Sequence, residues 1–217
     1  MGTTTSRTPE TGASQTNNST TGAPTYRWRV VDIITAAVLG VACGVIFWFW
    51  SVFGSVGLNF FDSLTPGLGG LFTGVWVIGG LLGGLIIRKP GAAIFVELLG
   101  AVVEAIMGTH FGPEVIYSGL AQGLGAELVF AAFRYRKFGV WVAVLAGICA
   151  NVGEWLLELV TMANYAKSLT YNLTLLGCMV ISGAVLAGLV SYWLVRGLAS
   201  AGALDRFAAG RERADLV

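Results

Sequence analysis

Six stretches of this chain are each about 20 residues long and almost free of charge, and that pattern limits the folds open to it. A helix needs about 20 apolar residues to cross roughly 30 Å of hydrocarbon. Hydrophobic residues make up 55% of the chain and charged residues only 12%, which excludes a soluble domain. We therefore predict an all-α integral membrane protein, a bundle of six transmembrane helices at about residues 31–50, 69–87, 91–108, 114–133, 139–162 and 172–195.

The basic residues indicate how this bundle is oriented. Of the 13 lysines and arginines, all but Lys167 fall on one side of the predicted membrane. Cytoplasmic loops are the ones that retain Lys and Arg, so both termini are predicted to be cytoplasmic, in a multi-pass protein of the cell membrane. The basic residues are too dispersed for a nucleic-acid partner. We predict a disordered cytoplasmic tail at 1–25, the membrane domain at 26–196 and a cytoplasmic C-terminal tail at 197–217.

Five glutamates lie inside the apolar stretches, which hold no lysine or arginine to neutralise them: Glu97, Glu104, Glu127, Glu154 and Glu158. An ionisable group at the bilayer centre costs about 2 to 3 kcal/mol, so such residues usually face a protein interior or a watery cavity and serve function. The pattern indicates a cationic or donor-rich ligand. The alternative is that some carboxyl groups join helices through hydrogen bonds, and the depth of Glu127 favours that structural role.

Helical spacing brings polar residues together in the outer half of the bundle. Glu97 and Glu104 are seven residues apart and share a face, and Asn151, Glu154 and Glu158 recur at i, i+3 and i+7. A tryptophan at that depth would attract a delocalised cation. We predict a pocket open to the outside, with substrate-binding residues Glu104, Glu154, Glu158, Asn151, Gln122, Trp76, Trp155, Tyr117, His110 and Glu97.

The first span and the segment after it concern partners and access. Ala36, Gly40 and Gly44 recur every four residues, a stripe that permits close helix approach. The stripe either packs within the bundle or forms a partner-docking face for another membrane protein. The segment at about 51–68 is unusually apolar for an outer loop, and we predict that it is a lid over the pocket.

Several motifs resemble those of one transporter family. They are residues 88–93 (RKPGAA) before a glutamate-bearing helix, Gly112-Pro113, residues 122–127 (QGLGAE) and residues 182–188 (SGAVLAG). From about residue 27 to 196 the chain resembles the YkoE family, substrate-binding S components of energy-coupling factor (ECF) transporters. The resemblance implies capture of thiamine or its hydroxymethylpyrimidine precursor. It also implies partnership with a transmembrane coupling subunit and two ATPase subunits, with the stripe at Ala36, Gly40 and Gly44 as the docking face.

Other functions fit the residues less well. No phosphate-binding Gly-Lys-Ser/Thr loop occurs, so the chain is expected to be no enzyme and to need no cofactor, with ATP hydrolysis left to the partners. Related families carry a cobalt-permease label, but a chain with one histidine is poorly suited to cobalt. A self-sufficient proton-coupled carrier of a small organic cation stays open as the alternative, with Glu104, Glu154 and Glu158 as protonation sites.

Overall fold

The computed structural model describes residue 2 and residues 26–214, and every regular element in that part of the chain is helical. The tail predicted to be disordered, residues 1–25, lies outside the described part of the chain except for residue 2. In chain order the elements are α1 (Val30–Leu64), η1 (Leu68–Val77), α2 (Ile78–Ile87), α3 (Ala92–Met107), η2 (Gly112–Glu114), α4 (Val115–Ala132), α5 (Val140–Thr161), η3 (Asn164–Ala166), α6 (Leu169–Ser182), η4 (Gly183–Leu189), α7 (Val190–Ser200) and α8 (Ala208–Ala214).

Five of the described helical segments are long and apolar enough to cross a membrane: Val30–Leu64, Leu68–Ile87, Gly112–Ala132, Val140–Thr161 and Leu169–Ser200. Each matches one of the predicted spans. The remaining predicted span, near residues 91–108, corresponds to α3, whose 16 residues are fewer than the roughly 20 that a perpendicular crossing needs. Helix α3 packs against α1, α2 and α4 in the interior of the bundle. The number of six membrane crossings stays a prediction.

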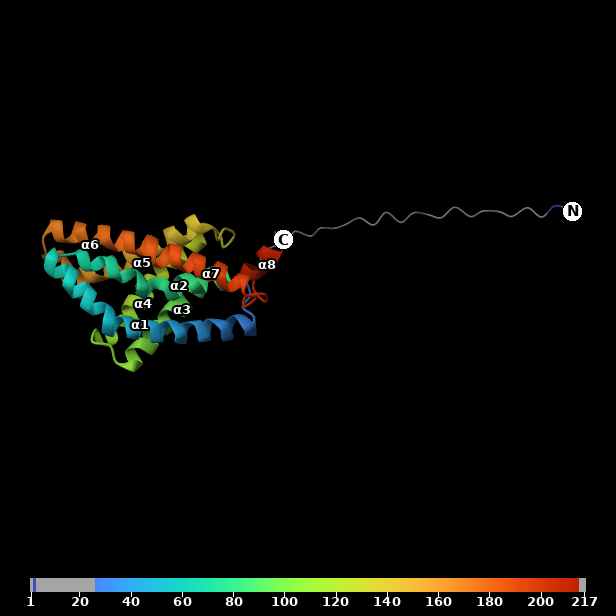
Figure 1. Ribbon diagram of the computed structural model, residues 1–217, viewed down its shortest axis with the longest axis horizontal. Coiled ribbons are helices and arrows are strands. Elements are labelled where there is room, and N and C mark those ends of the chain that lie inside the picture. Colours follow the sequence, from blue (N-terminus) through green and yellow to red (C-terminus); the bar gives the residue numbers. More distant parts are fainter. Residues whose placement is uncertain (1, 3–25, 215–217) are drawn as a thin grey trace.

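The first helix is much longer than the sequence patterns predict. Helix α1 continues through residues 51–64 and ends at Leu64. The next residue, Thr65, has an extended backbone (φ −151°, ψ 122°) and directly precedes Pro66. A proline disfavours helical geometry in the residue before it. Pro66 is the first proline after residue 30, and the helix ends just before it. The prediction of an outer loop at 51–68 is therefore wrong for residues 51–64. Figure 1 shows that α1 changes direction partway along its length.

The small-residue stripe of α1 faces the interior of the bundle. Ala36, Gly40 and Gly44 are all buried. A Cβ atom at Gly40 would lie 2.8 Å from the side chain of Leu99, and one at Gly44 would lie 2.7 Å from the carbonyl oxygen of Gly100. These contacts support the packing interpretation, in which small residues let α1 and α3 approach closely. The alternative, a partner-docking role for this stripe, stays a prediction.

Helix α5 crosses η4 at very close range. Gly147 and Gly183 meet at this crossing, where a Cβ on Gly147 would lie 2.1 Å from the carbonyl oxygen of Gly183. A Cβ on Gly183 would in turn lie 2.4 Å from the carbonyl oxygen of Gly147. Both distances are far shorter than van der Waals contact, so the crossing requires glycine on both helices. Element η4 is a π-helical segment that continues into α7.

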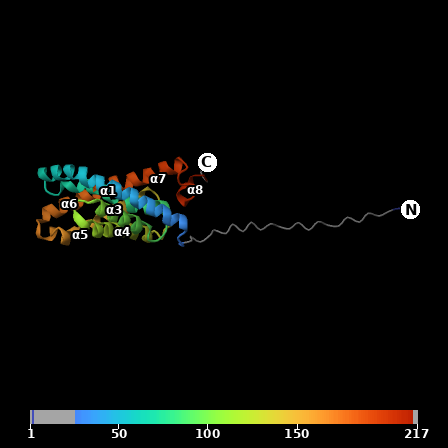
Figure 2. The ribbon, with the colours of Figure 1, turned by 90° about the horizontal axis from the view of Figure 1, so that it is seen from below.

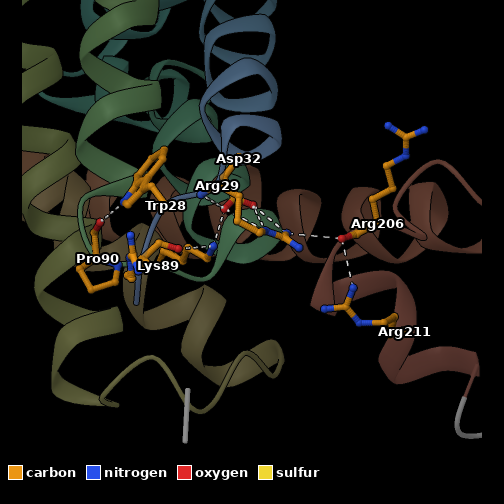
Figure 3. Close-up of polar contacts among 8 residues, drawn as sticks. Trp28, Arg29, Asp32, Lys89, Pro90, Arg206 and Arg211 are labelled. Carbon is orange, nitrogen blue, oxygen red and sulfur yellow. Dashed lines mark hydrogen bonds and ion pairs between the residues drawn. The ribbon is translucent and has the colours of Figure 1, made fainter. Parts of the chain in front are cut away.

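One end of the bundle gathers basic residues around a buried acid. Figure 3 shows Asp32, which is fully buried, between Arg29 and Lys89. Arg29 Nη2 lies 2.9 Å from Asp32 Oδ1, and Lys89 Nζ forms an ion pair with Asp32 Oδ2. Trp28 adds a 3.0 Å hydrogen bond from its indole nitrogen to the carbonyl oxygen of Pro90. We call the end of the bundle that holds Arg29, Asp32 and Lys89 the basic end.

The C-terminal segment folds against the same basic end and is not a free tail. Leu204 and Phe207 are buried in the main hydrophobic cluster. The guanidinium groups of Arg29 and Arg211 both donate to the carbonyl oxygen of Arg206, at 3.5 and 3.1 Å. Figure 1 and Figure 2 show the start of α1 and helix α8 at the same end of the molecule. The two ends of the described bundle therefore lie on one side of it.

Candidate substrate-binding site

A cavity of about 110 Å³ lies in the half of the bundle away from the basic end. Its wall comes from the second half of α1, from η1, and from the ends of α3, α4 and α5 that are remote from Asp32. The lining residues are Phe47, Leu58, Thr73, Trp76, Glu97, Ala101, Glu104, Phe111, Glu114, Val115, Ser118, Gly119, Gln122, Glu154, Leu157, Glu158, Thr161 and Met162.

The wall of this cavity is acidic and has no basic side chain to balance it. Glu97, Glu104, Glu114, Glu154 and Glu158 all line it, and none of the lining residues is a lysine, arginine or histidine. Four of these glutamates were predicted site residues, and so were Gln122 and Trp76, which line the same cavity. Helical spacing therefore brought together six of the ten predicted residues at one wall.

Glu104 is held by a chain of side-chain hydrogen bonds. The hydroxyl group of Ser51 donates to Glu104 Oε1 and accepts a 3.0 Å hydrogen bond from the indole nitrogen of Trp76. Ser51 and Glu104 are both buried, at 0% and 2% exposure. The side chains of α1, η1 and α3 are thereby tied together at the cavity wall, with Ser51 behind the two residues that line it.

Glu97 and Glu154 each present an oxygen that has no protein partner. Glu97 Oε2 accepts from the backbone N–H of Gly80 in the first turn of α2, and Glu154 Oε1 accepts a 2.8 Å bond from the Ser118 hydroxyl. Glu97 Oε1 and Glu154 Oε2 are buried and have no hydrogen-bond partner among the described residues. Buried polar atoms in native proteins are usually paired, so these two oxygens are available to a donor that enters the cavity.

Glu158 lines the same wall one turn beyond Glu154, toward the end of α5. It accepts a 3.3 Å hydrogen bond from the side-chain amide of Asn164, which is itself 1% exposed. The side-chain amide of Asn172 in turn donates to the carbonyl oxygen of Asn164 at 2.8 Å. The turn between α5 and α6 is therefore fixed to the end of α5, and it holds Glu158 at the wall.

Aromatic rings close part of the cavity. The rings of Trp76 and Phe111 meet edge to face, with centroids 5.8 Å apart. Both residues line the cavity, as does Phe47. A cation over the face of such a ring gains about 0.5 to 2 kcal/mol, so acidic and aromatic groups at one wall favour a positively charged organic guest.

Four predicted site residues do not reach this cavity. His110 is exposed and its ring packs at a tilt against that of Phe111, with centroids 3.9 Å apart, and Tyr117 is 63% exposed. Asn151 is fully buried one turn deeper than Glu154, against Gly183 at the crossing of α5 and η4. Trp155 follows Glu154 directly, so its side chain is rotated by about 100° around the helix.

Among the residues at or behind the cavity wall that were absent from the predicted set, three are polar residues that bear directly on its charge or contacts. Glu114 lies in the short η2 helix, where a helical-face argument does not apply. Ser118 precedes Gln122 by four residues and thus shares its face of α4, a signal that could have identified it. Ser51 falls in the predicted loop at 51–68, and only the extension of α1 to Leu64 brings it next to Glu104.

Glu127 has the structural role that its depth suggested. Its Oε1 accepts from the Gly91 N–H and the Tyr135 hydroxyl, both at 2.6 Å, and its Oε2 accepts from the Ala93 N–H at 3.0 Å. These N–H groups belong to the start of α3, where a helix leaves donors unpaired. Partial burial and the neighbouring Glu127 carboxylate raise the pKa of Tyr135, so its hydroxyl keeps the proton it donates.

Comparisons with known proteins agree with this architecture. Residues 31–153 match the family model described as an ABC-type cobalt transport system, permease component. A protein of Bacillus subtilis (strain 168) named as an HMP/thiamine permease, YkoE, is 36% identical over 187 residues, which cover 85% of this chain and 92% of that protein. A crystal structure of an S component of an ECF transporter superposes with a TM-score of 0.81 at 34% identity, over 87% of this chain and 94% of the other.

The cobalt description of the family model leaves the nature of the guest open. Among the described residues, no three His, Cys, Asp or Glu side chains are grouped as a metal site requires. The agreement in sequence and in fold extends over most of the described bundle. The chain is a multi-pass membrane protein that belongs to the YkoE family and has the fold of an ECF-transporter S component.

Proposed function

We propose that this chain captures thiamine, or its hydroxymethylpyrimidine precursor, in the acidic cavity and delivers it to an ATP-driven importer. The observation that carries the proposal is the set of five glutamates that line one cavity with no basic residue among them. The thiazolium ring of thiamine bears a permanent positive charge. Its aminopyrimidine ring offers both hydrogen-bond donors and acceptors, which match unpaired carboxylate oxygens and the amide of Gln122.

The proposed contacts divide between the two halves of the ligand. Glu104 and Trp76 would face the cationic ring, since a carboxylate and an aromatic face both attract a delocalised positive charge. Glu97 and Glu154, each with one free oxygen, would accept from the amino group of the pyrimidine. Glu158, toward the end of α5, would attract the cation as it enters. The name of the Bacillus subtilis relative supports this choice of substrates.

The proposal includes an orientation and partners. Both ends of the described bundle would lie in the cytoplasm, because basic residues gather there. The cavity would then open outward. Helix α3 would cross the membrane in addition to the five long helical segments, shielded from lipid by α1 and α4. A transmembrane coupling subunit and two ATPase subunits would supply the energy for import.

Binding to the isolated chain is the first test. The purified chain in lipid nanodiscs should bind thiamine or hydroxymethylpyrimidine in calorimetric titrations, and Co²⁺ should produce no saturable heat. Binding of Co²⁺ with no response to either organic compound would contradict the proposal.

Uptake into vesicles is the second test, and it separates an importer subunit from a carrier. Vesicles that contain the chain alone should not accumulate labelled thiamine under a proton gradient. Vesicles that also contain the coupling and ATPase subunits, with ATP, should do so. Accumulation by the chain alone would favour the proton-coupled carrier.

A further inference from the structure

Ser51 does not line the cavity, yet it contacts two residues that do. Its hydroxyl group lies between the carboxylate of Glu104 and the indole N–H of Trp76. It is fully buried in the middle of α1. A buried hydroxyl at this place fixes the positions of both neighbours without touching a ligand itself.

The direction of these hydrogen bonds follows from the chemistry of the three groups. An indole nitrogen can only donate, so the Ser51 oxygen accepts from Trp76. A serine hydroxyl has one proton to give, and that proton goes to Glu104 Oε1. Glu104 Oε1 is therefore an acceptor in this arrangement, and the donated hydrogen bond stabilises negative charge on the side chain against its burial, which acts in the opposite direction.

Other serines of the same helix behave differently. Ser55 and Ser63 donate to the backbone carbonyl oxygens of Val52 and Phe60, three residues earlier, at 3.2 and 2.7 Å. Such a local bond is the usual way for a serine to satisfy its proton within a helix. Ser51 instead donates its proton to the Glu104 carboxyl group on α3. Its hydrogen bond therefore joins α1 to the cavity wall and does not pair a backbone carbonyl of its own helix.

We propose that Ser51 is a positioning residue that sets the preference of the cavity for a cationic ligand. It does so by donating to Glu104, which stabilises negative charge on that carboxyl group, and by holding the Trp76 ring in place at the cavity wall. This inference rests on the proposed function, because it concerns how the same cavity distinguishes thiamine from hydroxymethylpyrimidine. The first compound carries a positive charge and the second does not, so only the first depends on the charge of Glu104.

The test is a pair of binding titrations with each of two variants. Ser51→Ala should weaken thiamine binding by about tenfold, the worth of one hydrogen bond to a charged group, and leave hydroxymethylpyrimidine binding within about twofold. Ser55→Ala is the matched control on the same helix and should change neither affinity. Ser51→Cys, with a similar volume and a weak donor, should give an intermediate, equally selective loss.

A double-mutant cycle identifies the residue through which Ser51 acts. In a Glu104→Gln background, Ser51→Ala should cause no further selective loss, because the charge that the serine supports is gone. The inference would be overturned if Ser51→Ala weakened the binding of both compounds equally, or weakened neither. In that case thiamine binding by the unaltered protein would still support the proposed function. If the unaltered protein bound neither compound, the proposed function would fail and the inference with it.

Discussion

The two ends of the helix bundle surround their buried acids in opposite ways. At the basic end, the fully buried Asp32 contacts the side chains of both Arg29 and Lys89. At the cavity, the equally buried Glu97 receives one backbone hydrogen bond and keeps Oε1 without a partner among the described residues.

This difference teaches that depth of burial does not separate structural acids from functional ones. Asp32 and Glu97 are both 0% exposed, yet one is surrounded by cations and the other is not. A buried charge with its partners in place stabilises the fold it belongs to. A buried carboxyl group without them lowers stability until a donor or cation arrives. The number of donors around each acid is the informative quantity.

Removal of the acid at the basic end should have the largest effect on stability. Asp32→Ala leaves the mostly buried Lys89 without its carboxylate and should lower the free energy of unfolding by about 3 kcal/mol. Chemical unfolding in detergent, followed by circular dichroism, measures this. The folded fraction should bind thiamine with unchanged affinity. A loss below about 1 kcal/mol would show that the ion pairs matter less than the comparison requires.

The next largest effect is expected at Glu127. Glu127→Gln keeps the size of the side chain but replaces one acceptor oxygen by an amide that cannot accept from the start of α3. It should lower the free energy of unfolding by about 2 kcal/mol, because a buried donor loses its partner. Ligand affinity should stay the same. A variant that unfolds normally but binds poorly would place Glu127 in the site instead.

Acids of the cavity should show the reverse pattern. Glu104→Gln and Glu158→Gln should each weaken thiamine binding at least tenfold, or about 1.4 kcal/mol. The stability of the empty protein should be unchanged or higher, since an uncompensated charge is removed. Isothermal titration and thermal unfolding of the same samples provide both values. Unchanged affinity in both variants would refute the assignment of the cavity as the binding site.

The smallest effect should separate two tryptophans that the sequence does not distinguish. Trp76→Phe retains a ring at the cavity wall but loses part of its attraction for a cation, and should weaken thiamine binding by about 0.5 kcal/mol. Trp155→Phe is the matched control and should leave the affinity unchanged, because Trp155 does not line the cavity. A larger effect at Trp155 would place the site on a neighbouring face of α5, about 100° around the helix from Glu154.

Helical periodicity predicted the site best where two residues share a face and both lie within the length of helix that the cavity covers. Glu97 and Glu104, two turns apart on α3, line the same cavity, and so do Glu154 and Glu158. Asn151 lies on the same face of α5 but one turn before Glu154, where it contacts Gly183 instead of the cavity. Periodicity gives the angle around a helix, and the contacts of neighbouring helices decide how deep a cavity reaches.

The extents of the helices were predicted less well for a related reason. About 20 apolar residues suffice for one span, which placed a loop after residue 50, but the helix continues until a residue that disfavours it, and Pro66 is the first proline after residue 30. The burial of Leu204 and Phe207 could not be predicted because only the tertiary fold brings the segment after α7 back to the bundle. Local patterns carry no information about such distant contacts.

The contact between Gly147 and Gly183 has a mechanical consequence. Two backbones that already touch through carbonyl oxygens cannot be pressed closer, and the absence of side chains leaves no soft layer between them to compress. Helix α5 and segment η4 therefore behave as one stiff frame behind Glu154 and Glu158. A change in the width of the cavity is therefore expected to involve movement of α1, η1, α3 or α4 relative to this pair.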